Sequence, residues 1–197
     1  MKEACKKCRR EGMKLMLKGE RCLSPNCGVV RKPYVPGDHG QNFRGKMSEY
    51  GKQLREKQKA RKIYFINEIQ FRNYVTKAQK MEGNKSENLM QMLETRLDNI
   101  VYRLGYGRSH SEARQMVSHG LFTVNAKNVR TPSYQVSVGD IVSLKKKDQF
   151  KEVTISSSIT WIDSNIKKFE STVRQLPSRE EIDTPINESL IIEYYSR

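Results

Sequence analysis

Hydrophobic residues recur at helical spacing through the middle of the chain. Apolar side chains between residues 71 and 78 follow an i, i+3, i+4, i+7 pattern, which predicts a helix with one buried face. Residues 82–88 are polar and typical of a linker, and the same apolar spacing resumes over residues 89–104, which predicts a second helix. The buried face of the first helix is predicted to comprise Phe71, Tyr74, Val75 and Ala78.

A third helix is predicted over residues 110–118. Ser109 and Glu112 have the spacing of a capping box, and Gly120 is a suitable left-handed stop. Apolar side chains are expected to face inward, and Arg and His side chains to lie on the surface of this helix pair. The expected polar positions are Arg96 and Arg103, which share a face seven residues apart, and the stripe of His110, Arg114 and Ser118.

Alternating patterns predict strands after the helices. Residues 121–129 are expected to form a hairpin that turns at Asn125–Asn128, and residues 133–144 a second pair about Gly139–Asp140. Residues 153–162 are predicted to be a strand and 178–182 a short capped helix. The chain then closes with SLIIEYYSR, expected to be buried through Leu190, Ile191 and Ile192. This order of elements predicts an α+β fold.

Residues 52–62 are strongly basic and follow Ser48, a good helix cap. The predicted helix is polar on all sides and Glu56 is its only acid, so it is expected to lack a core face. It is either a solvated helix or one that binds phosphates, and the net charge of the chain favours phosphate binding.

The chain of 197 residues carries a net charge of +15, unevenly distributed. Residues 1–90 hold 22 Lys and Arg against 9 Asp and Glu, whereas residues 161–197 hold 5 against 7. Segregated positive charge is typical of a nucleic-acid-binding protein.

No apolar run is long enough to span a membrane, and no apolar stretch follows the charged N-terminus as in a secretory signal. Residues 29–47 hold prolines and glycines without periodicity, which predicts an extended loop.

The four cysteines all fall within residues 5–27, as C-x2-C and C-x4-C. Two such pairs place four thiolates around one metal ion, and the nearby Lys and Arg residues are expected to lower the thiol pKa values. The leading hypothesis is one structural zinc ion bound by Cys5, Cys8, Cys22 and Cys27. An iron–sulfur cluster is the alternative, and disulfides or unligated thiols are the readings without a metal. Four cysteines would leave no open position for a catalytic metal.

Sequence motifs along nearly the whole chain resemble the bacterial-type family of ribosomal protein four of the small subunit. They are C-x2-C-RREG at 5–12, PGDHGQ at 36–41, YGKQLREKQKARKIY at 50–64, QFRNY at 70–74, LETRLDNIVYRLG at 93–105, SEARQMVSHG at 111–120, PSYQVSVGD at 132–140 and NESLIIEYYSR at 187–197.

The resemblance implies three parts: a zinc-binding arm and loop at 1–47, a helical domain at 48–92 completed by 163–197, and an RNA-binding module at 93–162 with two helices packed on a small antiparallel sheet. It implies a non-enzymatic cytoplasmic protein of the ribosome that binds the five-prime domain of small-subunit rRNA and nucleates assembly. It further implies contact with mRNA where mRNA enters the subunit, partnership with small-subunit proteins five and three, a role in accuracy, and no homo-oligomer. The expected RNA-binding residues are Arg9, Arg10, Lys14, Lys18, Arg21, Arg31, Lys32, His39, Arg44, Lys46, Lys52, Arg55, Lys57, Lys59, Arg61, Lys62, Arg72, Arg103, Arg108, Ser109, His110, Arg114, Gln115, Ser118 and His119.

The chain departs from that family at four places. Only four residues precede Cys5, Leu121 stands where many members have a polar residue, and the segment between Leu144 and Trp161 is short. Ala126 stands where the family commonly has Gly, which puts a tight primed hairpin turn in doubt.

Two other functions are compatible with parts of the sequence. An RNA-modifying enzyme could carry the same module, but it would need an acidic nucleophile, for which Asp98 and Asp140 are the only candidates within the module. A zinc-ribbon scaffold that binds protein would need the cysteines but not the basic surface. The motifs that flank the module, together with the ending of the chain, favour the ribosomal family over other proteins that carry the same module.

Overall fold

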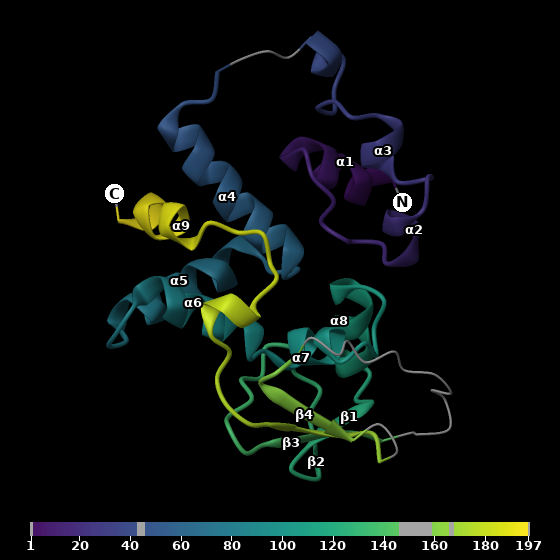
Figure 1. Cartoon of the computed structure of the whole chain (residues 1–197), viewed down its shortest axis with the longest axis vertical. Helices are drawn as coiled ribbons and strands as arrows, with labels where there is room; N and C mark the ends of the chain where they lie inside the picture. The colour runs from purple at the N-terminus through teal and green to yellow at the C-terminus, as the bar shows by residue number, and fades with distance from the viewer. Residues whose placement is uncertain (1, 43–45, 146–158, 166–167, 197) are drawn as a thin grey trace. The chain divides into compact units, whose positions relative to one another are not determined.

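The computed structural model of the chain describes residues 2–42, 46–145, 159–165 and 168–196 (Figure 1). The chain divides into two compact units. The first comprises Met1–Val75 and Pro185–Arg197, and the second comprises Thr76–Thr184. This division differs from the predicted one at two places, because residues 76–92 and 163–184 both belong to the second unit rather than to the helical domain. Among the described residues, no helix is long and apolar enough to cross a membrane.

Helices alone make up the regular structure described in the first unit. Its longest helix, α4, begins at the expected cap, where Ser48 Oγ accepts a hydrogen bond of 3.1 Å from the Gly51 amide. Helix α9 packs against α4 and buries Ile191, as expected, while Leu190 and Ile192 are half-buried. The elements are α1 (Lys2–Glu11), α2 (Glu20–Leu23), α3 (Gly28–Arg31), η1 (Gly40–Asn42), α4 (Glu49–Ile63), the first part of α5 (Glu68–Lys80) and α9 (Glu188–Tyr195).

The expectation that the basic helix lacks a core face is wrong. Gln53, Lys57, Ala60 and Ile63 are buried, three or four residues apart along α4. This spacing places them on one side of the helix. The pattern was hidden in the sequence because Gln53 and Lys57 are polar, although their side chains occupy core positions.

Helix α4 ends in a tight turn with an unusual residue at its bend. The Ile66 amide donates to the Arg61 carbonyl at 3.0 Å, and the Tyr64 amide donates to the Ala60 carbonyl at 3.1 Å. The bond from Ile66 to Arg61 is the six-to-one bond of a Schellman cap, in which the residue corresponding to Phe65 is commonly glycine. Phe65 has a φ of +53°, a left-handed conformation that costs an L-residue roughly 1–2 kcal/mol.

The predicted helix at 89–104 is two helices. Helix α6 (Lys85–Glu94) ends before Arg96, which is in an extended conformation, and α7 (Leu97–Arg103) follows. The chain at 132–136, predicted to be a strand, lies beside this break. The Leu97 amide donates to the Tyr134 carbonyl at 2.9 Å, and the Val136 amide donates to the Thr95 carbonyl at 2.9 Å. Apart from the single bridge of Arg96 with Gln135, residues 132–136 pair with no strand among those described.

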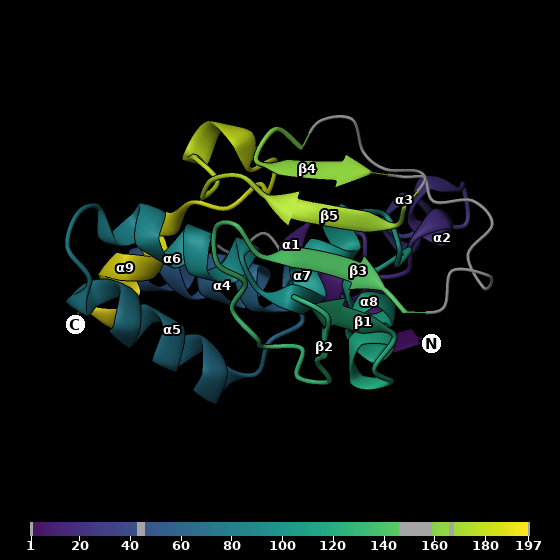
Figure 2. The same cartoon turned by 90° about the horizontal axis from the view of Figure 1, so that it is seen from below.

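The second unit packs helices on one face of an antiparallel sheet. Figures 1 and 2 show α7 and α8 on the same side of the strands. The core combines apolar residues of both helices with inward residues of the sheet, including Phe122, Trp161 and Val173. The elements beyond α6 and α7 are α8 (His110–Ser118), β1 (Phe122–Val124), β2 (Lys127–Asn128), β3 (Ile141–Leu144), β4 (Ile162–Asn165), β5 (Glu170–Val173) and η3 (Arg179–Glu181), and the described strands lie in the order β2-β1-β3-β5-β4.

The expected hairpin is present with its tight turn intact. Val124 pairs with Lys127, and the two residues between them, Asn125 and Ala126, have φ values of +49° and +64°. Two positive φ angles define a type I′ turn. The doubt that Ala126 raised is therefore resolved, since alanine occupies the position that glycine commonly fills. The strand predicted at 153–162 lies largely outside the described residues.

Candidate nucleic-acid interface

The basic residues of α4 are paired with carboxylates. Glu68 of α5 lies 2.9 Å from Lys57 and 2.6 Å from Arg61, and Glu11 of α1 contacts both Arg55 and Lys62. Within the helix, Lys52 pairs with Glu49 and Lys59 with Glu56, each at 2.6 Å. Glu56 is the only one of these acids within residues 52–62, so the basic segment taken alone does not reveal the pairing.

Lys57 occupies the centre of this network. Its side chain is 5% exposed, and its ammonium lies 4.6 Å from the ring centre of Tyr194. The Tyr195 hydroxyl donates to the Glu68 carboxylate at 2.9 Å, so Glu68 receives hydrogen bonds from both Lys57 and Tyr195. Burial opposes ionisation of Glu68, but these hydrogen bonds outweigh it and lower the pKa of the carboxyl. Lys57 therefore joins α4 to α9 and is withdrawn from solvent.

A second charge network lies at the break between α6 and α7. Arg96 is fully buried and makes a two-point contact with Asp98, at 2.9 and 2.6 Å. Arg114 of α8 reaches the same carboxylate at 3.3 Å. The expectation that Arg96 lies on the helix surface is wrong, because its guanidinium holds the chain where the helix breaks.

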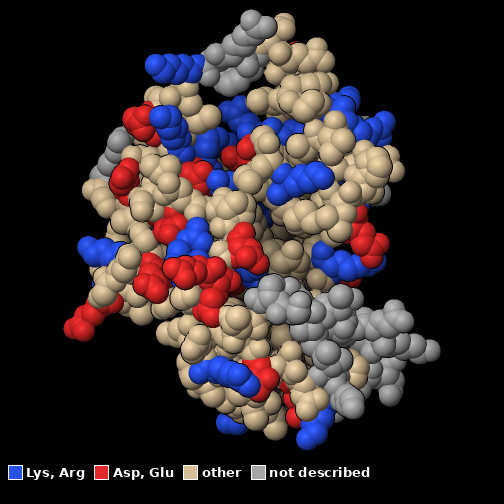
Figure 3. Space-filling view, viewed as in Figure 1, with Lys and Arg blue, Asp and Glu red and all other residues tan. Residues whose placement is uncertain are grey.

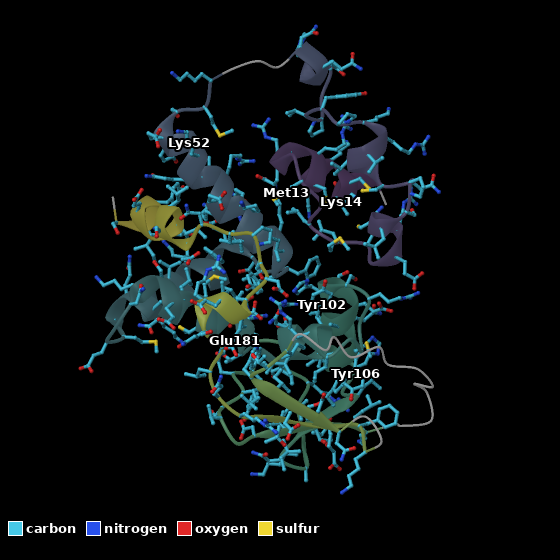
Figure 4. The ribbon with its side chains drawn as sticks, viewed as in Figure 1. Met13, Lys14, Lys52, Tyr102, Tyr106 and Glu181 are labelled. Atoms are coloured by element: carbon cyan, nitrogen blue, oxygen red, sulfur yellow. The ribbon has the colours of Figure 1, made fainter. Side chains whose placement is uncertain are left out.

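His110 and Arg103 belong to a neighbouring network around the buried carboxylate of Glu94. Arg103 binds Glu94 through two nitrogens, at 3.0 and 2.7 Å, and Asn99 binds it at 2.6 Å. His110 contacts Asn99 at 3.1 Å and stacks on the Tyr102 ring with centres 3.8 Å apart. Burial lowers the pKa of His110 to about 3, so the ring is neutral at pH 7. Tyr102 is labelled in Figure 4.

The arm before α4 has cations of a different kind. Lys6, Lys7, Arg10 and Lys14 lie on or just after α1 and are exposed. Lys6, Lys7 and Arg10 lie within about one turn of α1, and Lys14 follows shortly after the helix ends at Glu11. Lys14 and its neighbour Met13 are labelled in Figure 4, and Figure 3 shows several Lys and Arg side chains over this part of the molecule. Exposed, clustered cations are accessible to the phosphates of a nucleic acid.

Arg9 has a structural task within the same arm. Its Nε donates to the Tyr34 carbonyl at 2.9 Å, and its guanidinium lies 4.6 Å from the centre of the Tyr34 ring. These contacts fix the start of the loop at 33–42 against α1.

The structure places the predicted RNA-binding residues in three environments, with Arg44 outside the described residues. Exposed are Arg10, Lys14, Arg21, Arg31, Lys32, His39, Lys46, Lys52, Arg72, Arg108, Gln115, Ser118 and His119. Half-buried are Arg9, Lys18, Arg55, Lys59, Arg61, Lys62, Arg103, His110 and Arg114, and buried are Lys57 and Ser109. The predicted capping box is half formed: Ser109 accepts from the Glu112 amide, whereas Glu112 binds Arg108.

Sequence reasoning missed the carboxylates that organise these networks. Glu11, Glu68 and Glu94 lie 51, 11 and 9 residues from the cations they bind. No short-range spacing rule finds such pairs. Asp98, a candidate nucleophile or helix-surface residue by sequence, is instead the buried partner of Arg96.

The four cysteines line one small pocket in the arm, together with Leu17, Lys18 and Val29. Cys5 and Cys8 are on α1 rather than in a turn, and Cys27 precedes α3. Gly28 permits their approach, because a Cβ there would lie 2.7 Å from Cβ of Cys5. The Lys18 amide donates to Cys22 Sγ at 3.4 Å, a contact that suits a metal-bound thiolate. The residues present therefore fit a four-cysteine metal site in donor type, and all four line the same pocket.

Throughout the described part of the chain, no three His, Cys, Asp or Glu side chains are placed to hold one metal ion. Burial raises the pKa of Cys8, and the neighbouring cysteines add to that rise while a backbone hydrogen bond from Leu15 opposes it. For Cys8, the expectation that nearby Lys and Arg lower the thiol pKa is therefore wrong.

Two family models match consecutive parts of the chain. Residues 1–94 match the family described as the ribosomal protein S4/S9 N-terminal domain, and residues 95–142 match the S4 domain. The small ribosomal subunit protein uS4A of Clostridium novyi (strain NT) is 52% identical over 199 aligned residues, which cover 98% of this chain and 96% of the relative. The chain belongs to the ribosomal protein S4 family.

Other S4 proteins agree closely with it. The small ribosomal subunit protein uS4 of Clostridium beijerinckii is 52% identical, and uS4A of Clostridium botulinum (strain ATCC 19397 / Type A) is 51% identical, each over 98% of this chain and 96% of the relative. S4 proteins are structural, cytoplasmic components of the ribosome rather than enzymes. Family membership confirms the resemblance inferred from the motifs and removes the RNA-modifying enzyme from consideration.

Proposed function

We propose that this S4 protein is a structural component of the small ribosomal subunit that binds the five-prime domain of small-subunit rRNA and nucleates assembly there. The observation that carries the proposal is the exposed cluster of Lys6, Lys7, Arg10 and Lys14 on the arm. The paired cations of α4 and of the α6–α7 break stabilise the fold of their own units instead. Binding to rRNA is then led by the arm and supported by the exposed residues of the S4 domain, such as Arg108 and Gln115.

The finer assignments rest on the family. The protein is proposed to contact mRNA where mRNA enters the subunit, through the segment that contains Arg44 and Lys46. Lys46 is exposed, which supports this role. Partnership with small-subunit proteins five and three, and the contribution to translational accuracy, belong to the same proposal.

The arm is proposed to bind one zinc ion through Cys5, Cys8, Cys22 and Cys27. The shared pocket and the amide contact to Cys22 Sγ support this assignment. Zinc would supply a cross-link between α1 and the turn before α3, and no chemistry. An iron–sulfur cluster is the alternative occupant of the same four thiols.

The salt dependence of rRNA binding tests the main proposal. Affinity for a transcript of the five-prime domain is expected to fall steeply and linearly on a log–log plot against salt concentration. Replacing Lys6, Lys7, Arg10 and Lys14 with Gln should reduce the slope by about 3 to 4, since each phosphate that the variant no longer neutralises accounts for roughly 0.9.

The matched control replaces four other exposed lysines, Lys77, Lys80, Lys127 and Lys168, with Gln. This variant has the same net charge, so equal loss in the two variants would show that only total charge matters. A flat salt dependence for the unmodified protein contradicts the proposal, and association that resists nuclease but needs zinc would favour a protein-binding scaffold.

Zinc binding is tested by metal analysis of protein purified without added metal. We expect one zinc ion per chain, released to a chromogenic chelator when the thiols are modified, and none in Cys22→Ser. Visible absorption with bound iron would identify the cluster instead. Protein that carries neither metal contradicts the site.

A further inference from the structure

Two phenylalanines of this chain adopt a left-handed backbone conformation. Phe65 has a φ of +53° and Phe169 a φ of +54°. A bulky side chain in this region is an outlier that persists only when something compensates for it. Phe169 has an evident compensation, because its ring packs against the hydrophobic core of the second unit.

Among the described residues, Phe65 is not part of the buried core of the first unit. Its side chain is 47% exposed, whereas its neighbours Tyr64 and Ile66 are 2% and 6% exposed. The two buried neighbours and the Schellman hydrogen bond fix the backbone, so the turn holds the Phe65 ring toward solvent. Glycine would close the same turn without strain. Packing within the protein therefore does not account for the exposed half of this ring, and this exposure points to a contact with another molecule.

The surroundings of Phe65 fit RNA better than an apolar partner. Ile69, in the first turn of α5 and four residues after Phe65, is a second exposed apolar side chain at 73% exposure. Arg72 follows one turn later, and among the described residues no acidic side chain pairs with it. An exposed ring with an unpaired guanidinium close by in sequence is the combination that binds single-stranded nucleic acid, in which the ring stacks on a base and the cation meets the phosphate.

We infer that Phe65 is a stacking platform for an unpaired base of the bound RNA, and that the exposed Arg72, seven residues further along the chain, meets a phosphate of the same strand. This inference rests on the proposed rRNA binding and adds a contact that does not depend on charge. It also explains why a strained residue is retained where glycine would serve the fold better.

Substitution of Phe65 by glycine separates its role in the turn from its role in RNA binding. Phe65→Gly removes the ring and the strain together, so its melting temperature should equal or exceed that of the unmodified protein. Its affinity for the five-prime-domain transcript should fall about tenfold, the loss of one stacked base, with an unchanged salt slope. Phe169→Gly is the matched control, since it should lower the melting temperature through weakened core packing.

Fluorescence gives a direct readout of stacking. Phe65→Trp should restore affinity, and its emission should be quenched by saturating RNA. The natural Trp161 is 2% exposed and supplies a constant background. Arg72→Gln should lower the salt slope by about 1.

Unchanged RNA affinity in Phe65→Gly, or unquenched emission in Phe65→Trp, overturns the inference. So does a Phe65→Gly protein that binds RNA normally but fails to enter assembled subunits, because the ring would then meet a protein. Failure of the unmodified protein to bind the transcript would instead refute the proposed function, so the two failures are distinguishable.

Discussion

Helix α4 and the arm before it are both rich in Lys and Arg, yet they use these residues differently. Every Lys and Arg from Lys52 to Lys62 has a carboxylate partner within this unit, and Lys57 is buried. In the arm, Lys6, Lys7, Arg10 and Lys14 are exposed. A count of charges does not distinguish the two regions. The structure does, because Glu11 and Glu68 pair with cations of α4.

The S4 domain repeats the same division on a smaller scale. Arg96, Arg103 and Arg114 bind buried carboxylates, whereas the pair of Arg108 with Glu112 is largely exposed and Gln115 is exposed as well. Removing a carboxylate from the first kind of site leaves an unpaired charge in the interior, and this costs much more than losing an exposed pair. Stability measurements should therefore separate structural cations from those available to RNA.

The largest effect is expected at the break between α6 and α7. Asp98→Ala should lower the free energy of unfolding by about 3–5 kcal/mol, because it leaves the Arg96 guanidinium buried without a partner. Denaturant unfolding measures the change. Asp163→Ala removes the exposed pair with Arg174, 2.8 Å apart, and is expected to cost less than about 1 kcal/mol. Equal losses of stability in the two variants would contradict the distinction between buried and exposed ion pairs.

His110 is expected to make the free energy of unfolding depend on pH. Its pKa is lowered from 6.5 to about 3, so the folded state binds the neutral ring while the unfolded state takes up a proton below pH 6.5. The stability from His110 is thus fully present above pH 6.5 and is lost as pH falls toward 3. Between pH 7 and pH 5 the free energy of unfolding should drop by about 2 kcal/mol. In His110→Gln this drop should disappear, and its persistence would assign it to other groups.

Glu68 tests the pairing within the first unit. Glu68→Gln should lower the free energy of unfolding by about 1–2 kcal/mol, because Lys57 and Tyr195 lose a charged acceptor. Since the pKa of Glu68 is lowered, the difference from the unmodified protein should be present above about pH 4.5 and fade as pH falls below it. Glu49→Gln, in the exposed pair with Lys52, is the matched control and should change stability by less than about 0.5 kcal/mol.

The smallest effect on stability is expected in the arm. Replacing Lys6, Lys7, Arg10 and Lys14 with Gln should change the free energy of unfolding by no more than about 0.5 kcal/mol, while weakening RNA binding. Denaturant unfolding and RNA titration on the same preparation measure both quantities. A large loss of stability would mean that these cations too are structural.

Local sequence signals predicted much of the fold. The apolar spacing of Phe71 to Ala78 identified the buried face of α5, since all four residues are at most 8% exposed. Ser48 and Gly120 marked helix ends correctly. These features depend on neighbours three or four residues apart, which is the range that sequence patterns report.

The misses involve contacts between distant residues. The break at Arg96 depends on backbone bonds to residues 132–136, about 40 positions away, which override a continuous helical pattern. The burial of Lys57 depends on Glu68 and on Tyr195, near the far end of the sequence. Long-range contacts also limited the prediction of the candidate site. The family and the four cysteines were evident from sequence motifs. Which cations are paired depends on carboxylates that lie far away in the sequence and that only the fold brings near.

The discontinuity of the first unit has a consequence for the order in which the molecule is made. During synthesis, residues 76–184 emerge after α4 but before α9, so the second unit is complete while the first still lacks a helix. Until α9 arrives, Glu68 lacks the hydroxyl of Tyr195 and Gln53 lacks the carboxylate of Glu193. The inserted unit is thus available for folding first, and the unit that carries the arm closes last.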